Sequence, residues 1–158
     1  MEKKENPEFS ATAETKELLL DLLRSLNCKQ VDSPDDSIRA YYRGEGFIFF
    51  VHERNVRIFD PVWAHISNNS PELTLIWEAV NFTNTRSRPT VFLSDPDEND
   101  VIQIHCRYDL LLYPSCPDNE EILRELLDSF FDAKGCLRQA SYDLFTAENN
   151  RKKQQENR

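Results

Sequence analysis

The acidic turn from Asp95 to Asp100 is the first place where the sequence offers groups that could do chemistry. Asp95, Asp97 and Asn99 supply oxygen atoms at the first, third and fifth positions, as a calcium-binding loop does. Such a loop also needs a glycine at its sixth position and a glutamate at its twelfth, where this chain has Asp100 and Cys106. We therefore expect a solvated hairpin turn and no calcium site.

Histidine and cysteine side chains are the other potential metal ligands. His105 and Cys106 are adjacent on an expected strand, so their side chains point to opposite faces and do not reach one ion together. Cys116 lies farther along the chain. His52 and His65 fall on neighbouring expected strands, where only a coincident pairing would join them. We expect no metal site and no cofactor.

A covalent enzyme would need an activated nucleophile, and the sequence contains no serine elbow or cysteine signature that supplies one. Cys28 or Cys116 could still be reactive, although the spacing of the cysteines is typical of reduced structural thiols. Gly44 and Gly46 open a strand and not a helix, so they do not form a phosphate-binding loop. We expect a protein that is not an enzyme.

The chain has 158 residues and a formal net charge of −9, with 39% hydrophobic and 30% charged residues. The acidic charge argues against DNA or RNA as a partner, because phosphate binding depends on clustered lysine and arginine. No apolar run approaches the roughly 20 residues of a membrane span. Because the charged segment Met1–Pro7 does not lead into an apolar stretch, we expect no secretion signal and a cytoplasmic location.

The spacing of the hydrophobic residues changes along the chain. These changes mark the helices and strands that must position the candidate residues. After a loose lead over residues 1–12, leucines at helical spacing from Leu18 to Leu26 predict a first helix. Pro61 marks a bulge or an edge position within the three strands that follow. These strands are expected at residues 38–43, 47–52 and 56–66.

The second half repeats this alternation. A helix is expected from Pro71 to Val80, then strands at residues 90–94 and 101–113, then a helix from Asp118 to Gly135. Residues 13–137 are thus expected to form one α+β two-layer domain, with an antiparallel sheet and helices on one face. Residues 138–158 would extend the last helix or fray as a charged tail.

The middle of the expected sheet is apolar on both faces. A strand with one wet face carries polar residues at alternate positions, and the second and third strands do not. Either the tail packs over the second face or a partner covers it, and the register around Pro61 decides which residues face outward. Because aromatic side chains anchor protein interfaces, we expect a partner-binding surface formed by Ile48, Phe50, Phe59 and Trp63.

Four stretches carry a family resemblance: Ile38–His52, Ile58–Trp63, Trp77–Asn81 and Leu126–Phe131. Within residues 15–137 they resemble the YbjN-type domain, particularly its Bacteroidetes members. The resemblance implies the fold shared with type III secretion chaperones and frequent dimerisation. It also implies no catalytic residues, since these domains are described as regulators of sensory transduction. It marks Asn81 as a helix-terminal cap, while Pro61 and the long tail depart from the pattern and leave the dimer axis open.

The sequence therefore favours a non-enzymatic regulatory module that binds itself, as a homodimer, or another protein through the apolar sheet face. The alternative is a small-molecule-binding protein or enzyme with a pocket between the second helix and the sheet, using Cys106, His105 or His52. A chaperone for a secreted protein is a third hypothesis, which rests on fold analogy alone.

Overall fold

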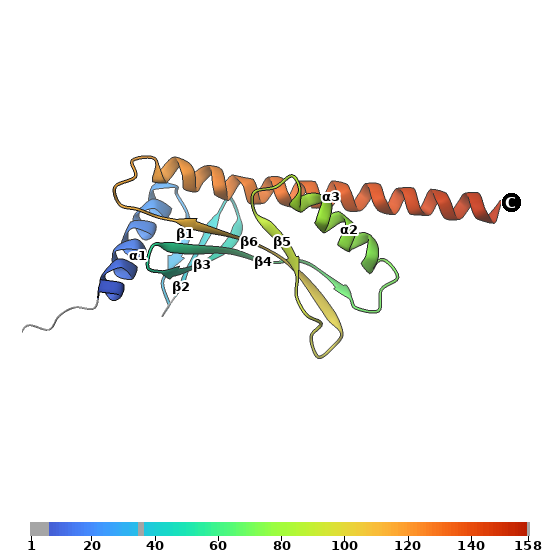
Figure 1. Ribbon diagram of the computed structural model, residues 1–158, viewed down its shortest axis with the longest axis horizontal. Coiled ribbons are helices and arrows are strands. Elements are labelled where there is room, and N and C mark those ends of the chain that lie inside the picture. The colour runs from blue at the N-terminus through green and yellow to red at the C-terminus, as the bar shows by residue number, and fades with distance from the viewer. Residues whose placement is uncertain (1–6, 35–36, 158) are drawn as a thin grey trace, which may run out of the picture. The chain divides into compact units, whose positions relative to one another are not determined.

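The computed structural model describes residues 7–34 and 37–157, and its elements follow the expected order with one addition (Figure 1). Within these residues the six strands form one antiparallel sheet in the order β1-β2-β3-β4-β6-β5, which confirms the α+β class. The added element is β1, a short edge strand. The elements are α1 (Pro7–Ser25), β1 (Lys29–Asp32), β2 (Ser37–Tyr42), β3 (Glu45–His52), β4 (Asn55–Ser67), α2 (Leu73–Asn84), β5 (Thr90–Leu93), β6 (Val101–Leu111) and α3 (Asn119–Glu156).

The first and last helices are longer than the sequence pattern indicates. α1 begins at Pro7, inside the stretch expected to be loose, and residues 1–6 lie outside the described part of the chain. Proline is favoured at the first helical position because its ring fixes φ and its missing N–H would have no helical acceptor there. α3 continues to Glu156, so the residues after Gly135 extend this helix.

The chain forms two compact units. The first contains the described residues up to Pro61 together with Arg107–Asp128, and the second contains Val62–Cys106 together with the described residues from Ser129 onward. β4, β6 and α3 each contribute residues to both units. Residues 13–137 contribute to both units, and their expected organisation as a single domain stays a prediction.

The core of the first unit lies on one face of β2, β3 and β4. Ala40 pairs with Phe47, and Phe49 pairs with both Ile38 and Ile58, so that these side chains share a face and are buried. α1 contacts β1 and β3, and Leu19, Leu23 and Leu26 of the predicted leucine stripe are buried. Among the described helical residues of this unit, the fully buried apolar side chains are Leu19, Leu23, Leu123 and Leu127.

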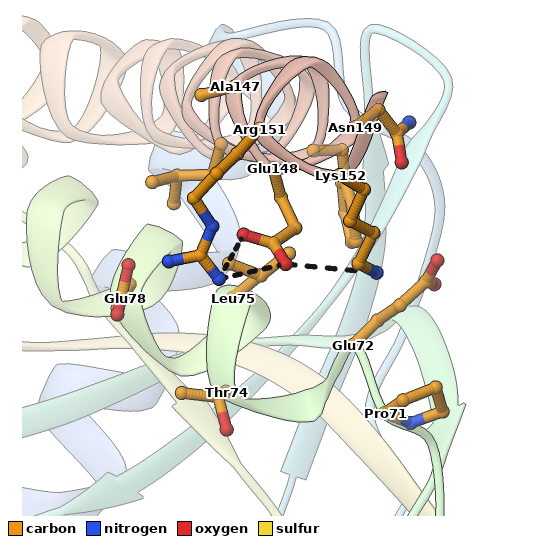
Figure 2. Close-up of a pocket in the computed structure, with 12 residues that line it drawn as sticks. Pro71, Glu72, Thr74, Leu75, Glu78, Ala147, Glu148, Asn149, Arg151 and Lys152 are labelled. Carbon is orange, nitrogen blue, oxygen red and sulfur yellow. Dashed lines mark hydrogen bonds and ion pairs between the residues drawn. The ribbon is translucent and has the colours of Figure 1, made fainter. Parts of the chain in front are cut away.

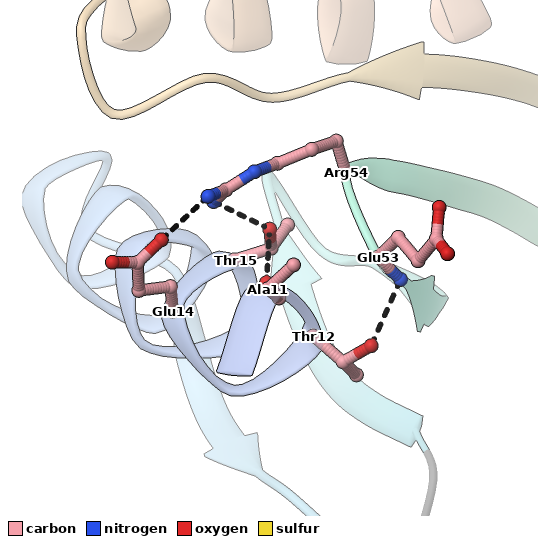
Figure 3. Close-up of polar contacts among 6 residues, drawn as sticks. All are labelled: Ala11, Thr12, Glu14, Thr15, Glu53 and Arg54. Atoms are coloured by element: carbon pink, nitrogen blue, oxygen red, sulfur yellow. Dashed lines mark hydrogen bonds and ion pairs between the residues drawn. The ribbon is translucent and has the colours of Figure 1, made fainter. Parts of the chain in front are cut away.

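A polar cluster joins the first half of α1 to the β3–β4 turn (Figure 3). The backbone N–H of Glu53 donates to Thr12 Oγ1 at 2.9 Å, and the Arg54 guanidinium bonds Glu14 at 2.5 Å and Thr15 Oγ1 at 3.3 Å. The buried Thr15 hydroxyl donates to the carbonyl of Ala11 at 2.8 Å. These contacts provide partners for a helical segment that has no apolar periodicity.

In the second unit, α2 contacts β5, and its residues Ala79, Val80 and Thr83 are buried. Asn84 joins the end of this helix to the strand: its Nδ2 donates to the Val91 carbonyl at 2.9 Å, and its Oδ1 accepts from the Val91 N–H at 2.8 Å. The remaining core comes from β6 and α3 and includes Ile102, Ile104, Cys106, Phe130, Ala133 and Leu137.

Candidate functional site

The candidate site is the sheet surface of the first unit that faces away from its core, here called the outer face. The register places Ile48 opposite Phe59 and Phe50 opposite Arg57. Cross-strand partners share a face, and strand residues alternate between faces. The outer face of β2, β3 and β4 therefore comprises Arg39, Tyr41, Ile48, Phe50, Arg57 and Phe59.

Several of these side chains are large, apolar and open to solvent. Tyr41 is 46% exposed and Phe50 is 45% exposed, while Ile48 and Phe59 are half-buried between their neighbours. β6 adds Leu111, which is 59% exposed and lies two residues beyond Asp109 on the same side of the strand. Within the first unit, the outer face thus presents apolar groups that a partner could cover.

One ion pair crosses this apolar surface. Arg57 Nε donates to Asp109 Oδ1 at 2.8 Å, and a second guanidinium nitrogen reaches Oδ2 at 3.4 Å. The hydrogen bond to Asp109, followed by the charge of this carboxylate, raises the pKa of Arg57. Because both side chains are about half exposed, the pair contributes little to the free energy of unfolding. It fixes polar groups at known positions beside Phe50.

A shallow recess of about 480 Å³ lies next to Phe50. Val51, His52, Asn55 and Arg57 complete its lining. The imidazole, amide and guanidinium groups can donate hydrogen bonds, and the phenyl ring supplies apolar contact. This combination suits a side chain or chain segment of a protein partner.

Gly46 shapes the outer face beside Tyr41, its cross-strand partner. A Cβ atom at Gly46 would lie 3.3 Å from Cε1 of the Tyr41 ring, which is tighter than ordinary packing. Glycine therefore lets the Tyr41 ring approach the neighbouring strand closely.

Of the four residues expected to bind a partner, Ile48, Phe50 and Phe59 lie together on the outer face, whereas Trp63 belongs to the second unit. Val62 has φ of 53°, a backbone conformation that interrupts the alternation of β4 directly after Pro61. The half-buried Trp63 ring instead faces the Lys134 ammonium of α3, 5.4 Å from its centroid.

The residues expected for the alternative pocket lie in different surroundings. Cys106 is fully buried, while the ring of its neighbour His105 packs against Phe92 with 5.4 Å between centroids. His52 is exposed and lies in the first unit. The part of the chain that the structure describes contains no cluster of three or more histidine, cysteine or acidic residues placed to hold a metal ion.

Other expected positions are placed as follows. The Asp97 carboxylate accepts hydrogen bonds from the N–H groups of Asn99 at 2.8 Å and Val101 at 3.0 Å, which closes the acidic hairpin turn.

Asn81 is exposed at the end of α2, where its backbone carbonyl accepts a hydrogen bond from the N–H of Thr85. The side-chain bonds to β5 come from Asn84. Cys28, Cys106, Cys116 and Cys136 carry thiols and are not joined by disulfides.

Sequence reasoning missed three contributors to the outer face: Tyr41, Leu111 and the Arg57–Asp109 pair. Extending the alternation of the last strand two residues beyond Asp109 would have found Leu111. The ion pair needed the adjacency of β4 and β6, which no local pattern gives.

No family model matches this sequence, and no curated protein matches it. Among the helices that the structure describes, none has the length and apolar character of a bilayer span. Among solved structures, the fold is similar to that of YbjN from E. coli, a proposed transcription regulator, with a TM-score of 0.53 and 10% identity over 81% of this chain and 92% of that one. It is also similar to an uncharacterized protein from Methanothermobacter thermautotrophicus, with a TM-score of 0.49 and 11% identity over 87% and 98% of the two chains. The likeness to YbjN, at this identity, concerns the fold alone, and it shows that the chain has a YbjN-type fold.

Proposed function

We propose that this protein is a non-enzymatic, cytoplasmic regulatory module that binds a second copy of itself, or another protein, through the outer face of its first unit. The observation that carries the proposal is the exposure of Tyr41, Phe50 and Leu111 on one sheet surface, with Ile48 and Phe59 between them. Aromatic side chains that are half exposed in the free chain are typical anchors of protein interfaces.

The chemistry of the outer face also supports binding to protein. The Arg57–Asp109 pair and the recess beside Phe50 place hydrogen-bonding groups around apolar ones, as in the core and rim of an interface. YbjN, which has the same fold, is itself described as a proposed transcription regulator, and this description agrees with a regulatory role.

The small-molecule alternative has less support. A pocket between α2 and the sheet would need open space beside the helix, whereas α2 contacts β5 and its residues Ala79, Val80 and Thr83 are buried. Its candidate polar residues are divided, with His52 in the first unit and His105 and Cys106 on opposite faces of β6.

The proposal is tested by measuring the mass of the native protein over a range of concentrations. We expect the wild-type chain to form a dimer and Phe50→Glu to shift it to the monomer of 18.6 kDa, because a carboxylate at this position would be desolvated in the interface. Trp77→Glu is the matched control, since Trp77 is 46% exposed and lies on α2.

If the protein is a monomer at every concentration, a second copy of the chain is excluded as the partner. Immobilised wild-type and Phe50→Glu chains would then be compared for proteins that they retain from the cell of origin. Equal retention by both chains would contradict a docking role for the outer face.

A further inference from the structure

A second candidate surface lies in the second unit, between α2 and the C-terminal half of α3, and is here called the α2–α3 groove. It consists of two adjoining hollows of about 510 and 520 Å³. Glu78 of α2 and Leu144 of α3 line both of them, so the hollows follow each other along the same pair of helices. The groove shares no residue with the outer face.

The floor of the groove is apolar. Phe82, Cys136, Ala140 and Leu144 line one hollow, and Leu75, Phe145 and Ala147 line the other. The Phe82 ring is 44% exposed, with the Arg86 guanidinium 3.6 Å from its centroid. Several of these residues recur four positions apart along their helices, which is the spacing of a single helical face.

The dimensions favour a helix as the occupant. The lining residues of α3 run from Cys136 to Lys152, and at 1.5 Å per residue this stretch measures roughly 24 Å. A partner helix of about 16 residues has the same length. A compact small molecule would fill one hollow and leave the other open.

The charges at the rim indicate the chemistry of that helix. Figure 2 shows Glu148 between Arg151 and Lys152, and its carboxylate lies 3.0 and 3.7 Å from their nitrogen atoms. Both of these cations are therefore paired with a carboxylate of their own helix. Further carboxylates at the rim come from Glu72, Glu78 and Asp143. The rim is acidic, in a chain whose formal net charge is −9.

We propose that the α2–α3 groove binds an amphipathic helix of a protein partner, about four turns long, with leucine-like side chains on one face and lysine or arginine on its flanks. Apolar side chains at positions i, i+3, i+4 and i+7 would enter the two hollows, as in other helix-in-groove complexes. Basic flanks would approach Glu72, Glu78 and Asp143, which favours this partner over an acidic one. The proposal is independent of the outer face.

The test uses a fluorescent synthetic peptide of about 16 residues with leucines at that spacing and lysines at the flanks. We expect anisotropy to report binding to the full chain, and a peptide with glutamates in place of the lysines to bind at least about tenfold more weakly. Glu78→Lys should remove most of this preference, because the residue is exposed and its substitution leaves the acidic and basic groups of the rim about balanced.

Leu144→Glu should abolish binding, and Trp77→Glu should leave it unchanged, because Trp77 lines neither hollow. Circular dichroism checks that both variants are folded. Thiol alkylation gives a second readout: the bound peptide should slow the labelling of Cys136 and leave the labelling of Cys28 and Cys116, which lie in the first unit, unchanged.

Three results would overturn the proposal. The first is that the lysine peptide fails to bind. The second is that it binds but does not slow the labelling of Cys136, or that its affinity is the same for the wild-type chain and for Leu144→Glu. The third is a native dimer that Leu144→Glu dissociates while Phe50→Glu does not, because a second copy of the chain would then occupy the groove. Phe50→Glu does not change the α2–α3 groove. It therefore tests the outer-face proposal without affecting the test of the groove.

Discussion

Nδ1 of His105 accepts a hydrogen bond from the backbone N–H of Val62 at 3.1 Å. Val62 has a positive φ of 53°, which is unfavourable for a β-branched residue and is retained only where the surroundings enforce it. An acceptor at Nδ1 requires an imidazole that is not protonated at this atom. The backbone conformation of β4 after Pro61 is therefore linked to the protonation state of one histidine.

This link predicts a loss of stability at acidic pH. Burial lowers the pKa of His105 below its ordinary value of 6.5, so between these two values the unfolded chain binds more protons than the folded one. The stabilisation is complete above pH 6.5 and is lost as the pH falls through the folded-state pKa. Urea unfolding of the wild type and of His105→Gln, which keeps an acceptor but does not titrate, measures the effect. An unchanged pH slope in His105→Gln would contradict it.

Asn84 should contribute more to stability than Asn81. Asn84→Ala removes two hydrogen bonds to the Val91 backbone, and we expect a loss of about 1–3 kcal/mol in the free energy of unfolding. Asn81→Ala makes the same chemical change near the same end of α2 at an exposed position and should stay within about 0.5 kcal/mol. Chemical denaturation compares the two variants, and equal losses would show that the Asn84 bonds are unimportant.

The contribution of the polar cluster on α1 to the free energy of unfolding should be measurable at Thr15. Thr15→Val keeps the shape of a buried side chain but removes its donor to Ala11 and its acceptor for Arg54, so we expect a loss of about 1 kcal/mol. A double-mutant cycle with Arg54→Met isolates the bond between Thr15 and Arg54. Strict additivity of the two losses would mean that this bond does not contribute.

Tyr42 predicts a second dependence on pH, at the alkaline end. Burial, and after it the hydrogen bond to Asp128 at 3.0 Å, raises the pKa of Tyr42 above its ordinary value of 10.0. The unfolded chain loses this proton first, so stability falls as the pH rises above 10.0. Tyr42→Phe should reduce this decline, and Tyr142→Phe, at a position 67% exposed, should not. Thermal unfolding at neutral and alkaline pH compares them.

The elements that the sequence predicts correctly are those with a regular apolar period. α2 and the first half of α3 repeat at helical spacing, and β3 and β6 show buried residues at alternate positions. β1 was missed because Lys29–Asp32 contains only one apolar residue, Val31, and is defined by pairing with β2. The start of α1 was missed because its partners are the distant residues Glu53 and Arg54.

Only the part of the candidate site that follows a regular apolar period could be predicted from the sequence. Alternation alone places Ile48 and Phe50 on one face of β3, and the hairpin brings Phe59 beside them. Alternation does not place Trp63 in the same way, because the positive φ of Val62 interrupts it one residue earlier. The α2–α3 groove depends on the packing of two helices that are far apart in sequence, and no local pattern indicates it.

Residues 62–106 are nested in the sequence of the first unit, because that unit resumes at Arg107. During synthesis, α1 and β1–β3 emerge from the ribosome well before Leu112, Leu123 and Leu127, which complete their core. The apolar core around Phe47 and Phe49 therefore stays incomplete while the insertion is translated, and during this interval the nascent chain is more open to aggregation or to a helper protein.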